Sequence, residues 1–279
     1  MSLRGQSSPQ PTAKPTIVIV HGAFTDASSW MGMSGHALFG HGHGVIERLQ
    51  QHGYTVIAAP NPLRGVRADS AYLASLLSQL DGPILLVAHS YGGAVISNGA
   101  ANASNVVGLV YVAALIPEEG ERLAEVQSKV SILNPHLIER RYPTGITGET
   151  ATEYSIDPAH FRAVFAADVP EERTRLMAVA QRPIASAAFS DTSGPVAWKT
   201  LPSWAIVATE DVGAGYDIVR SMAQRAGAKV TELKGSHAIM SSQPEAVADV
   251  ILEAAQSISL PAGRASASLD HQLSGHSNP

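Results

Sequence analysis

Short apolar runs rich in β-branched residues recur along this chain and alternate with segments of helical periodicity. The apolar runs are Thr16–Val20, Thr55–Ala59, Ile84–Ala88, Val107–Val112, Trp204–Ala208 and Lys229–Leu233. The helical patterns cover 45–52, 69–80, 91–101, 215–226 and 244–257. Strands that are apolar on both faces are typical of a parallel sheet covered by helices on both sides. The alternation therefore predicts an α/β fold whose mainly parallel sheet has about six strands flanked by helices.

The alternation stops between about 119 and 198. This stretch is rich in Ala, Glu and Arg, carries helical patterns such as FRAVFAADV, and shows no clear buried strand. We therefore predict a core over 15–118 and 199–260, with a helical cap over 119–198. The cap is expected at the C-terminal edge of the sheet, where open α/β sheets bind ligands. The polar ends, 1–14 and 262–279, are predicted to be disordered.

Composition argues against several classes of function. The 279 residues carry a net charge of −5 without a basic cluster, so neither nucleic acid nor an anionic membrane is an expected partner. No apolar run approaches the ~20 residues of a membrane span, and the N-terminal residues lack the apolar segment of a secretory signal. A cytoplasmic location is therefore the default expectation. Cysteine is absent, which excludes thiolate catalysis and cysteine-bound zinc.

The stretch VAHSYGGAV joins the third apolar run to the next helical pattern. A strand, a sharp turn and a helix are the context of a nucleophile elbow, in which a strained turn exposes a serine. The residues two before and two after that serine must be small, and here they are Ala88 and Gly92. Ala88 departs mildly from the usual glycine. We predict that Ser90 is the nucleophile, although a purely structural serine turn has the same local sequence.

A serine hydroxyl needs a base, and the base needs an orienting acid. His237 follows the last apolar run, so its loop is expected at the sheet edge that carries Ser90. For the acid, the preceding run WAIVATED offers Asp211, with Glu210 as the fallback. We predict that Asp211 orients His237, which takes the proton of Ser90. The alternatives are that His237 is a solvent-facing loop histidine and that Asp211 caps a helix.

Acyl transfer also requires donors for the developing oxyanion. The backbone N–H of Tyr91, at the start of a helix, is one candidate. The loop HGAF after the first run supplies the other, the N–H of Ala23, because Gly22 allows close approach. His21 is predicted to hold this loop through hydrogen bonds, and Asp26 to cap a turn.

Together these stretches resemble the α/β-hydrolase superfamily, and in particular its small, cofactor-free bacterial serine esterases, which share features with plant methylesterases and hydroxynitrile lyases. The resemblance rests on IVIVHGAF, VAHSYGGAV, VATED and GSHAIMSSQPEAV, in that order, and spans residues 16 to about 257. It implies hydrolysis of carboxylic esters or lactones through an acyl-enzyme, a helical cap, and no metal or other cofactor. Epoxide hydrolases and haloalkane dehalogenases have a carboxylate at the nucleophile position. Ser90 at this position therefore argues against both branches. Ala238 after His237 argues against lyase activity.

The sequence therefore predicts a serine hydrolase of the esterase type, whose substrate is a hydrophobic small-molecule ester. Phe24, Phe161 and Phe165 are candidates to line the substrate site, although they could equally pack the cap on the core. A C–C bond hydrolase or a cofactor-free perhydrolase with the same residues stays open, as does a small-molecule receptor on a hydrolase scaffold. The chain is expected to be a monomer or a homodimer.

One departure from relatives is the insertion MGMSGHALFGHGHG at 31–44, rich in glycine and histidine. We favour a flexible surface loop, because glycine weakens any fixed ligand geometry. The alternatives are a mobile flap and a weak zinc or nickel site at His41 and His43.

Overall fold

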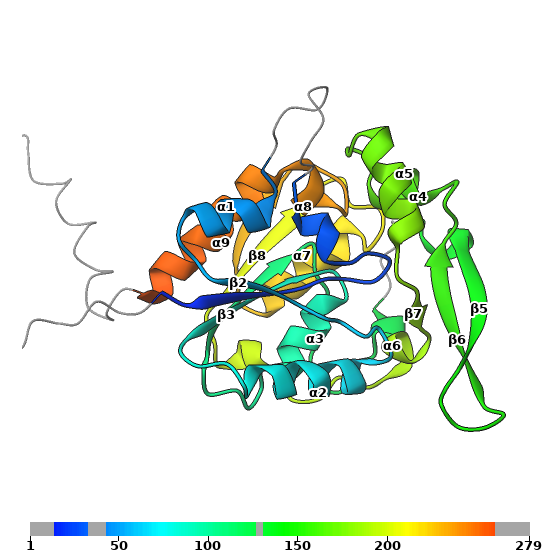
Figure 1. Ribbon diagram of the computed structural model, residues 1–279, viewed down its shortest axis with the longest axis horizontal. Coiled ribbons are helices and arrows are strands. Elements are labelled where there is room, and N and C mark those ends of the chain that lie inside the picture. The colour runs from blue at the N-terminus through cyan, green and yellow to red at the C-terminus, as the bar shows by residue number, and fades with distance from the viewer. Residues whose placement is uncertain (1–13, 33–42, 127–130, 260–279) are drawn as a thin grey trace, which may run out of the picture.

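A six-stranded parallel sheet forms the centre of the computed structural model, which describes residues 14–32, 43–126 and 131–259 (Figure 1). The strand order is β2-β1-β3-β4-β8-β9. The strands are β1 (Thr16–Val20), β2 (Val56–Ala59), β3 (Ile84–His89), β4 (Val106–Val112), β8 (Ser203–Ala208) and β9 (Lys229–Leu233). The helices around them are α1 (Val45–Gln51), α2 (Val66–Leu77), α3 (Gly92–Gly99), α7 (Tyr216–Arg225), α8 (Ile239–Ser242) and α9 (Pro244–Ser259). The predicted fold class is confirmed.

Each face of the sheet has its own hydrophobic core. Ile17 and Ile19 of β1 belong to the core that α1 and α9 complete. Val18 and Val20 point the other way and join the core formed with α2, α3 and α7. Successive side chains of a strand alternate between faces, so burial of both sets requires apolar residues at every position. This requirement explains why the strands read as continuous apolar runs.

The inserted segment, residues 119–198, is not helical throughout, and the prediction of a helical cap is wrong in this respect. It contains a three-stranded antiparallel sheet, β5-β6-β7, whose hairpin projects from one side of the molecule (Figure 1). Its strands are β5 (Leu137–Pro143), β6 (Thr150–Ile156) and β7 (Ile184–Ala185). Its helices are α4 (Phe161–Phe165), α5 (Glu171–Ala180) and α6 (Ala187–Ser190), with 3-10 turns at Leu123–Glu125, Asn134–His136 and Ala197–Lys199.

The hairpin escaped prediction because its strands are largely exposed. β5 reads LIERRYP, and its central residues Glu139, Arg140 and Arg141 face solvent, so no buried run marks it. The turn between β5 and β6 does carry a signal, since Gly145 and Gly148 both adopt positive φ. Glycine tolerates that conformation without strain, and glycines between two β-prone runs indicate a hairpin.

The loop between β2 and α2 ties the inserted segment to the core. The Leu63 carbonyl accepts a hydrogen bond of 2.9 Å from the Ala185 N–H of β7. The Arg64 guanidinium pairs with Glu153 of β6 at 2.7 Å and lies 4.4 Å from the centre of the Tyr142 ring. The antiparallel sheet is thus attached next to the first turn of α2. Among the described residues, none of the helices is both long enough and apolar enough to cross a bilayer.

Candidate active site

Ser90 occupies the sharp turn between β3 and α3. Its φ is +53°, a left-handed conformation that is strained for a residue with a side chain. Backbone hydrogen bonds hold Ser90 in this conformation. The Ser90 N–H donates to the Val112 carbonyl at 3.2 Å, and the Ser90 carbonyl accepts from the Leu115 N–H at 3.0 Å. A Cβ at Gly92 would lie 2.8 Å from the Val20 carbonyl oxygen. The requirement for small residues at this turn is therefore steric.

Three side chains predicted from separate parts of the chain meet above the sheet. His237 Nε2 lies 2.8 Å from the Ser90 hydroxyl oxygen, and His237 Nδ1 lies 2.7 Å from an Asp211 carboxylate oxygen. A carboxylate can only accept, so the proton of the neutral ring sits on Nδ1 and leaves Nε2 free to accept from Ser90. All three residues are buried, with exposed fractions of 7%, 3% and 2% for Ser90, His237 and Asp211. This geometry allows the ring to accept the serine proton while the carboxylate stabilises the resulting imidazolium.

The loop after β8 holds the Asp211 carboxylate in place. Its second oxygen accepts hydrogen bonds from the N–H groups of Gly213 and Ala214 at 2.9 and 3.0 Å. The loop sequence VGAGYD, residues 212–217, thus supplies amides that hold one carboxylate oxygen while the other faces His237. The fallback Glu210 is exposed and pairs with Lys234 at 3.5 Å, so its carboxylate does not contact the histidine.

The loop after β1 packs directly against the serine turn. A Cβ at Gly22 would lie 2.7 Å from the Cβ of Ser90, so only glycine fits there. His21 is buried, its Nδ1–H donates to the Gly22 carbonyl at 2.9 Å, and its own carbonyl accepts from Asn61 at 2.8 Å. Burial lowers the pKa of His21. Neither the Ala23 nor the Tyr91 N–H donates a hydrogen bond within the described residues, which leaves both amides available to a ligand.

A buried carboxylate missed by the sequence reasoning lies behind the serine turn. Asp69 of α2 accepts a 2.7 Å hydrogen bond from the Tyr91 hydroxyl and two of 3.1 Å from the Arg64 N–H. Burial raises the pKa of Asp69, although these bonds favour its ionised form. The signal was present in the sequence, because Asp69 falls on the apolar stripe of α2 with Val66 and Leu73.

The aromatic residues predicted to line the substrate site are all buried. Phe165 lies against the histidine, with its ring edge-on at 5.0 Å from the His237 ring centre. Phe161 packs on Phe165 at 5.0 Å and is 0% exposed. Phe24 sits in the loop after β1 with a φ of +58°. Phe165 thus packs directly against His237. A substrate-binding role for the three rings stays a prediction.

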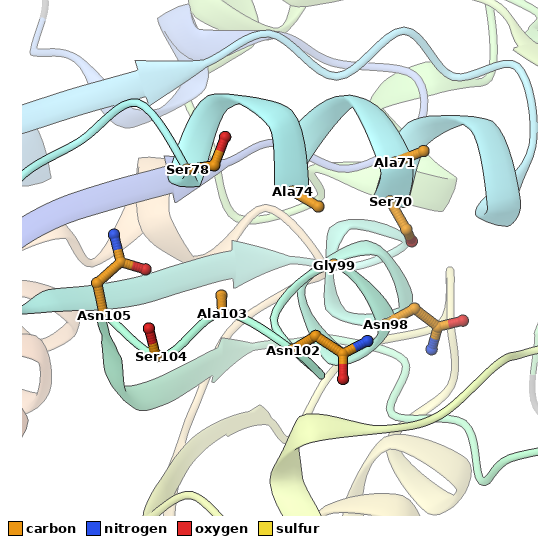
Figure 2. Close-up of a pocket in the computed structure, with 10 residues that line it drawn as sticks. All are labelled: Ser70, Ala71, Ala74, Ser78, Asn98, Gly99, Asn102, Ala103, Ser104 and Asn105. Atoms are coloured by element: carbon orange, nitrogen blue, oxygen red, sulfur yellow. The ribbon is translucent and has the colours of Figure 1, made fainter.

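An open groove of about 500 Å³ lies away from Ser90, between α2 and the region of α3 and the following loop (Figure 2). It is lined by small and polar side chains, among them Ser70, Ser78, Asn98 and Asn105. The side-chain amides of Asn98 and Asn105 are already hydrogen-bonded to backbone and side-chain groups of the protein. No nucleophile–base pair among the described residues faces this groove.

His41, named above as a candidate in the 31–44 insertion, lies outside the described residues. His43 is described; it is exposed and lies 3.3 Å from the Gln51 amide. Across 14–32, 43–126 and 131–259, no group of three or more His, Cys, Asp or Glu side chains is placed to hold a metal ion.

A strained serine between a parallel strand and a helix, bonded to a histidine and a carboxylate from later loops, is the arrangement of the α/β-hydrolase class. A family model agrees with this class: residues 17–250 match the model described as "Alpha/beta hydrolase family". The chain therefore belongs to the alpha/beta hydrolase family and is a hydrolase of that type.

Solved structures show the same fold at low sequence identity. Polyneuridine aldehyde esterase superimposes with a TM-score of 0.71 at 19% identity, over 87% of this chain and 99% of that one. A methylesterase from Arabidopsis gives 0.66 at 19%, over 87% and 99%. A pyrethroid hydrolase from Sphingobium faniae gives 0.67 at 20%, over 87% and 97%. A search of curated proteins returned no match.

Proposed function

We propose that the protein is a serine esterase that hydrolyses carboxylic esters or lactones through an acyl-enzyme. The observation that carries the proposal is the continuous hydrogen-bonded line from Ser90 through His237 to Asp211, with oxygen–nitrogen distances of 2.8 and 2.7 Å. The esterase names of the structures with this fold support the same class of substrate.

In the first half-reaction the Ser90 oxygen attacks the ester carbonyl carbon while its proton moves to His237 Nε2. The carbonyl oxygen becomes an oxyanion, for which the Ala23 and Tyr91 N–H groups are the proposed donors. Each such donor is worth about 3 kcal/mol of the barrier. His237 then gives its proton to the leaving alcohol as the carbon–oxygen bond breaks, and the acyl group stays on Ser90.

In the second half-reaction a water molecule takes the place of the alcohol. His237 Nε2 accepts a water proton as the oxygen attacks the acyl carbon, and the proton passes to Ser90 when the ester bond to the enzyme breaks. Asp211 accepts the hydrogen bond from His237 Nδ1–H throughout and keeps the imidazole in the productive tautomer. The chemistry requires no group beyond these side chains and amides.

The buried surroundings of Ser90 favour an apolar substrate. Phe165 lies edge-on against the His237 ring, and Phe24 is buried in the loop after β1, which packs against the serine turn. The acyl or alcohol part of the ester is therefore expected to be hydrophobic.

The decisive experiment compares Ser90→Ala with the wild type on p-nitrophenyl esters from acetate to palmitate and on several lactones. Loss of a catalytic serine lowers kcat by about 10⁶-fold, which removes detectable turnover. Ser78→Ala is the matched control, because Ser78 is an exposed serine in the groove of Figure 2. Unchanged hydrolysis by Ser90→Ala would refute the proposal.

The same panel, extended by a diketone substrate, separates two of the alternatives, a receptor and a C–C bond hydrolase. A receptor would release at most one equivalent of p-nitrophenol and then stop, whereas an esterase continues to turn over. A C–C bond hydrolase would need Ser90 but would prefer a diketone substrate to the esters.

A further inference from the structure

His89, the residue before the nucleophile, has no part in the mechanism above, yet it is completely buried beside the base. Its exposed fraction is 0%, and its ring centre lies 4.6 Å from that of His237, at an angle of 49°. The Phe165 ring stands edge-on to both imidazoles, at 6.0 Å from His89 and 5.0 Å from His237. A buried histidine is costly unless it is hydrogen-bonded, so its bonds indicate its purpose.

The single hydrogen bond of the His89 ring goes to the main chain of the base. Nε2 lies 2.9 Å from the His237 carbonyl oxygen, which can only accept, so Nε2 carries the proton. Nδ1 has no partner among the described residues and faces Gly22, where a Cβ would come within 2.8 Å of it. Burial, helped by the neighbouring His237, holds the pKa of His89 well below its ordinary value. His89 is therefore a neutral donor with one fixed tautomer.

The peptide group that joins His237 to Ala238 is held at both ends. Its carbonyl accepts from His89, and its N–H, which belongs to Ala238, donates to the Phe165 carbonyl at 3.0 Å. A peptide group is a rigid plane, so fixing both ends fixes the plane and, with it, the position of the His237 Cα from which the imidazole extends. The two partners come from different regions, His89 from the end of β3 and Phe165 from the end of α4.

We propose that His89 is a positioning residue: together with the Phe165 carbonyl it clamps the 237–238 peptide and aims the His237 imidazole at Ser90. The proposal rests on the serine-hydrolase function argued above. It differs from a packing role, because a packing role needs the volume of the His89 ring, whereas the clamp needs its N–H donor.

Two variants of similar length separate these roles. His89→Gln keeps an amide N–H donor near the position of Nε2, and His89→Met fills the same space without a donor. The primary readout is the rate of covalent labelling of Ser90 by a fluorophosphonate, measured at several probe concentrations on folded protein. We expect His89→Met to lower the maximal labelling rate by about tenfold to a hundredfold, the scale of a small misplacement at an active site, with unchanged probe affinity. His89→Gln is expected to recover most of that rate.

A second readout does not depend on catalysis. The proton between His237 Nδ1 and Asp211 should give a far-downfield proton resonance that persists in His89→Gln and broadens or moves in His89→Met. Equal labelling rates and equal resonances for the two variants would overturn the clamp and leave a packing role. Failure of wild-type Ser90 to react with the probe would instead overturn the proposed function, and the resonance comparison would still decide on His89.

Discussion

The strands of the central sheet and those of the inserted segment differ in how far they are buried. Every residue of β3 is buried, and apolar side chains cover both faces of the sheet. In the inserted segment the middle of β5 is exposed, although Phe161, Phe165 and Ile184 are buried in the hydrophobic core that covers one face of the sheet. Ion pairs such as Arg64–Glu153 and Arg225–Glu121 add to this attachment. The core therefore has the rigidity to fix the loops that carry Ser90, Asp211 and His237. The inserted segment adds contacts to a site that the core has already assembled.

The largest expected effect concerns the core loops. Asp211→Asn should lower kcat by about 10⁴-fold with little change in KM, because an amide facing Nδ1 favours the wrong imidazole tautomer. Steady-state kinetics on the best p-nitrophenyl ester measures it. Glu210→Gln changes the adjacent, exposed carboxylate and should keep the wild-type kcat. Similar losses in both variants would mean that Asp211 has no specific role.

A cavity in the core should cost far more stability than truncation in the inserted segment. Leu86→Ala in β3 removes a fully buried side chain and is expected to cost about 2–5 kcal/mol of unfolding free energy. Val179→Ala in α5 trims a side chain that is 78% exposed and should change stability by at most about 0.5 kcal/mol. Urea unfolding measures both, and comparable costs would contradict the difference in burial between β3 and the outer face of α5.

Removing the hydrogen bond between Tyr91 and Asp69 should lower the free energy of unfolding by an amount that depends on pH. Tyr91→Phe removes a donor from buried Asp69 and is expected to cost about 1–3 kcal/mol at neutral pH. Burial already raises the folded-state pKa of Asp69, and losing this donor raises it further. The cost should therefore be smallest in acid, where the carboxyl is protonated, and grow as pH rises through the folded-state pKa.

Tyr111→Phe is the matched control, because the buried Tyr111 hydroxyl bonds to the neutral Ser97 hydroxyl at 2.9 Å. Its cost should not vary over the same acidic range. A flat profile for Tyr91→Phe would show that Asp69 does not titrate there.

The smallest effect is expected at a junction between the regions. Glu121→Gln breaks the ion pair with Arg225 of α7. Because the Glu121 and Arg225 side chains are 30% and 37% exposed, the change should lower the free energy of unfolding by less than about 1 kcal/mol at pH 7. Arg225 lowers the folded-state pKa of Glu121, so the stability that the pair contributes is lost as pH falls through that pKa. Unfolding midpoints at neutral and acidic pH test this, with Glu119→Gln as the exposed control. A cost that persists in acid would point to packing instead of charge.

The parts of the structure that the sequence predicted well are those whose physical demands are local. A covered parallel strand must be apolar throughout, and the bounds predicted for β1 and β9 coincide with those observed. The serine turn needs small neighbours, and Ala88 and Gly92 satisfy that need. Chain order then limited the partners of Ser90, and the predicted contacts with His237 and Asp211 are present. Their catalytic roles stay predictions.

The features that escaped prediction depend on neighbours distant in the sequence. Strands β5 and β6 stabilise each other mainly by backbone pairing, and their charged side chains gave no apolar pattern. The position of Asp69 on the apolar stripe of α2 indicates burial, but its partner, the Tyr91 hydroxyl, lies 22 residues away and is identified only by the structure. The bond from His89 to the His237 carbonyl spans 148 residues and could not be inferred from spacing.

The 237–238 peptide has one partner in each region, so the position of the base depends on the inserted segment as well as on the central sheet. Warming that loosens α4 would release the Ala238 N–H while the sheet is still intact. We therefore expect heat inactivation to begin several degrees below the calorimetric melting transition, and to reverse on cooling as long as the sheet has not melted.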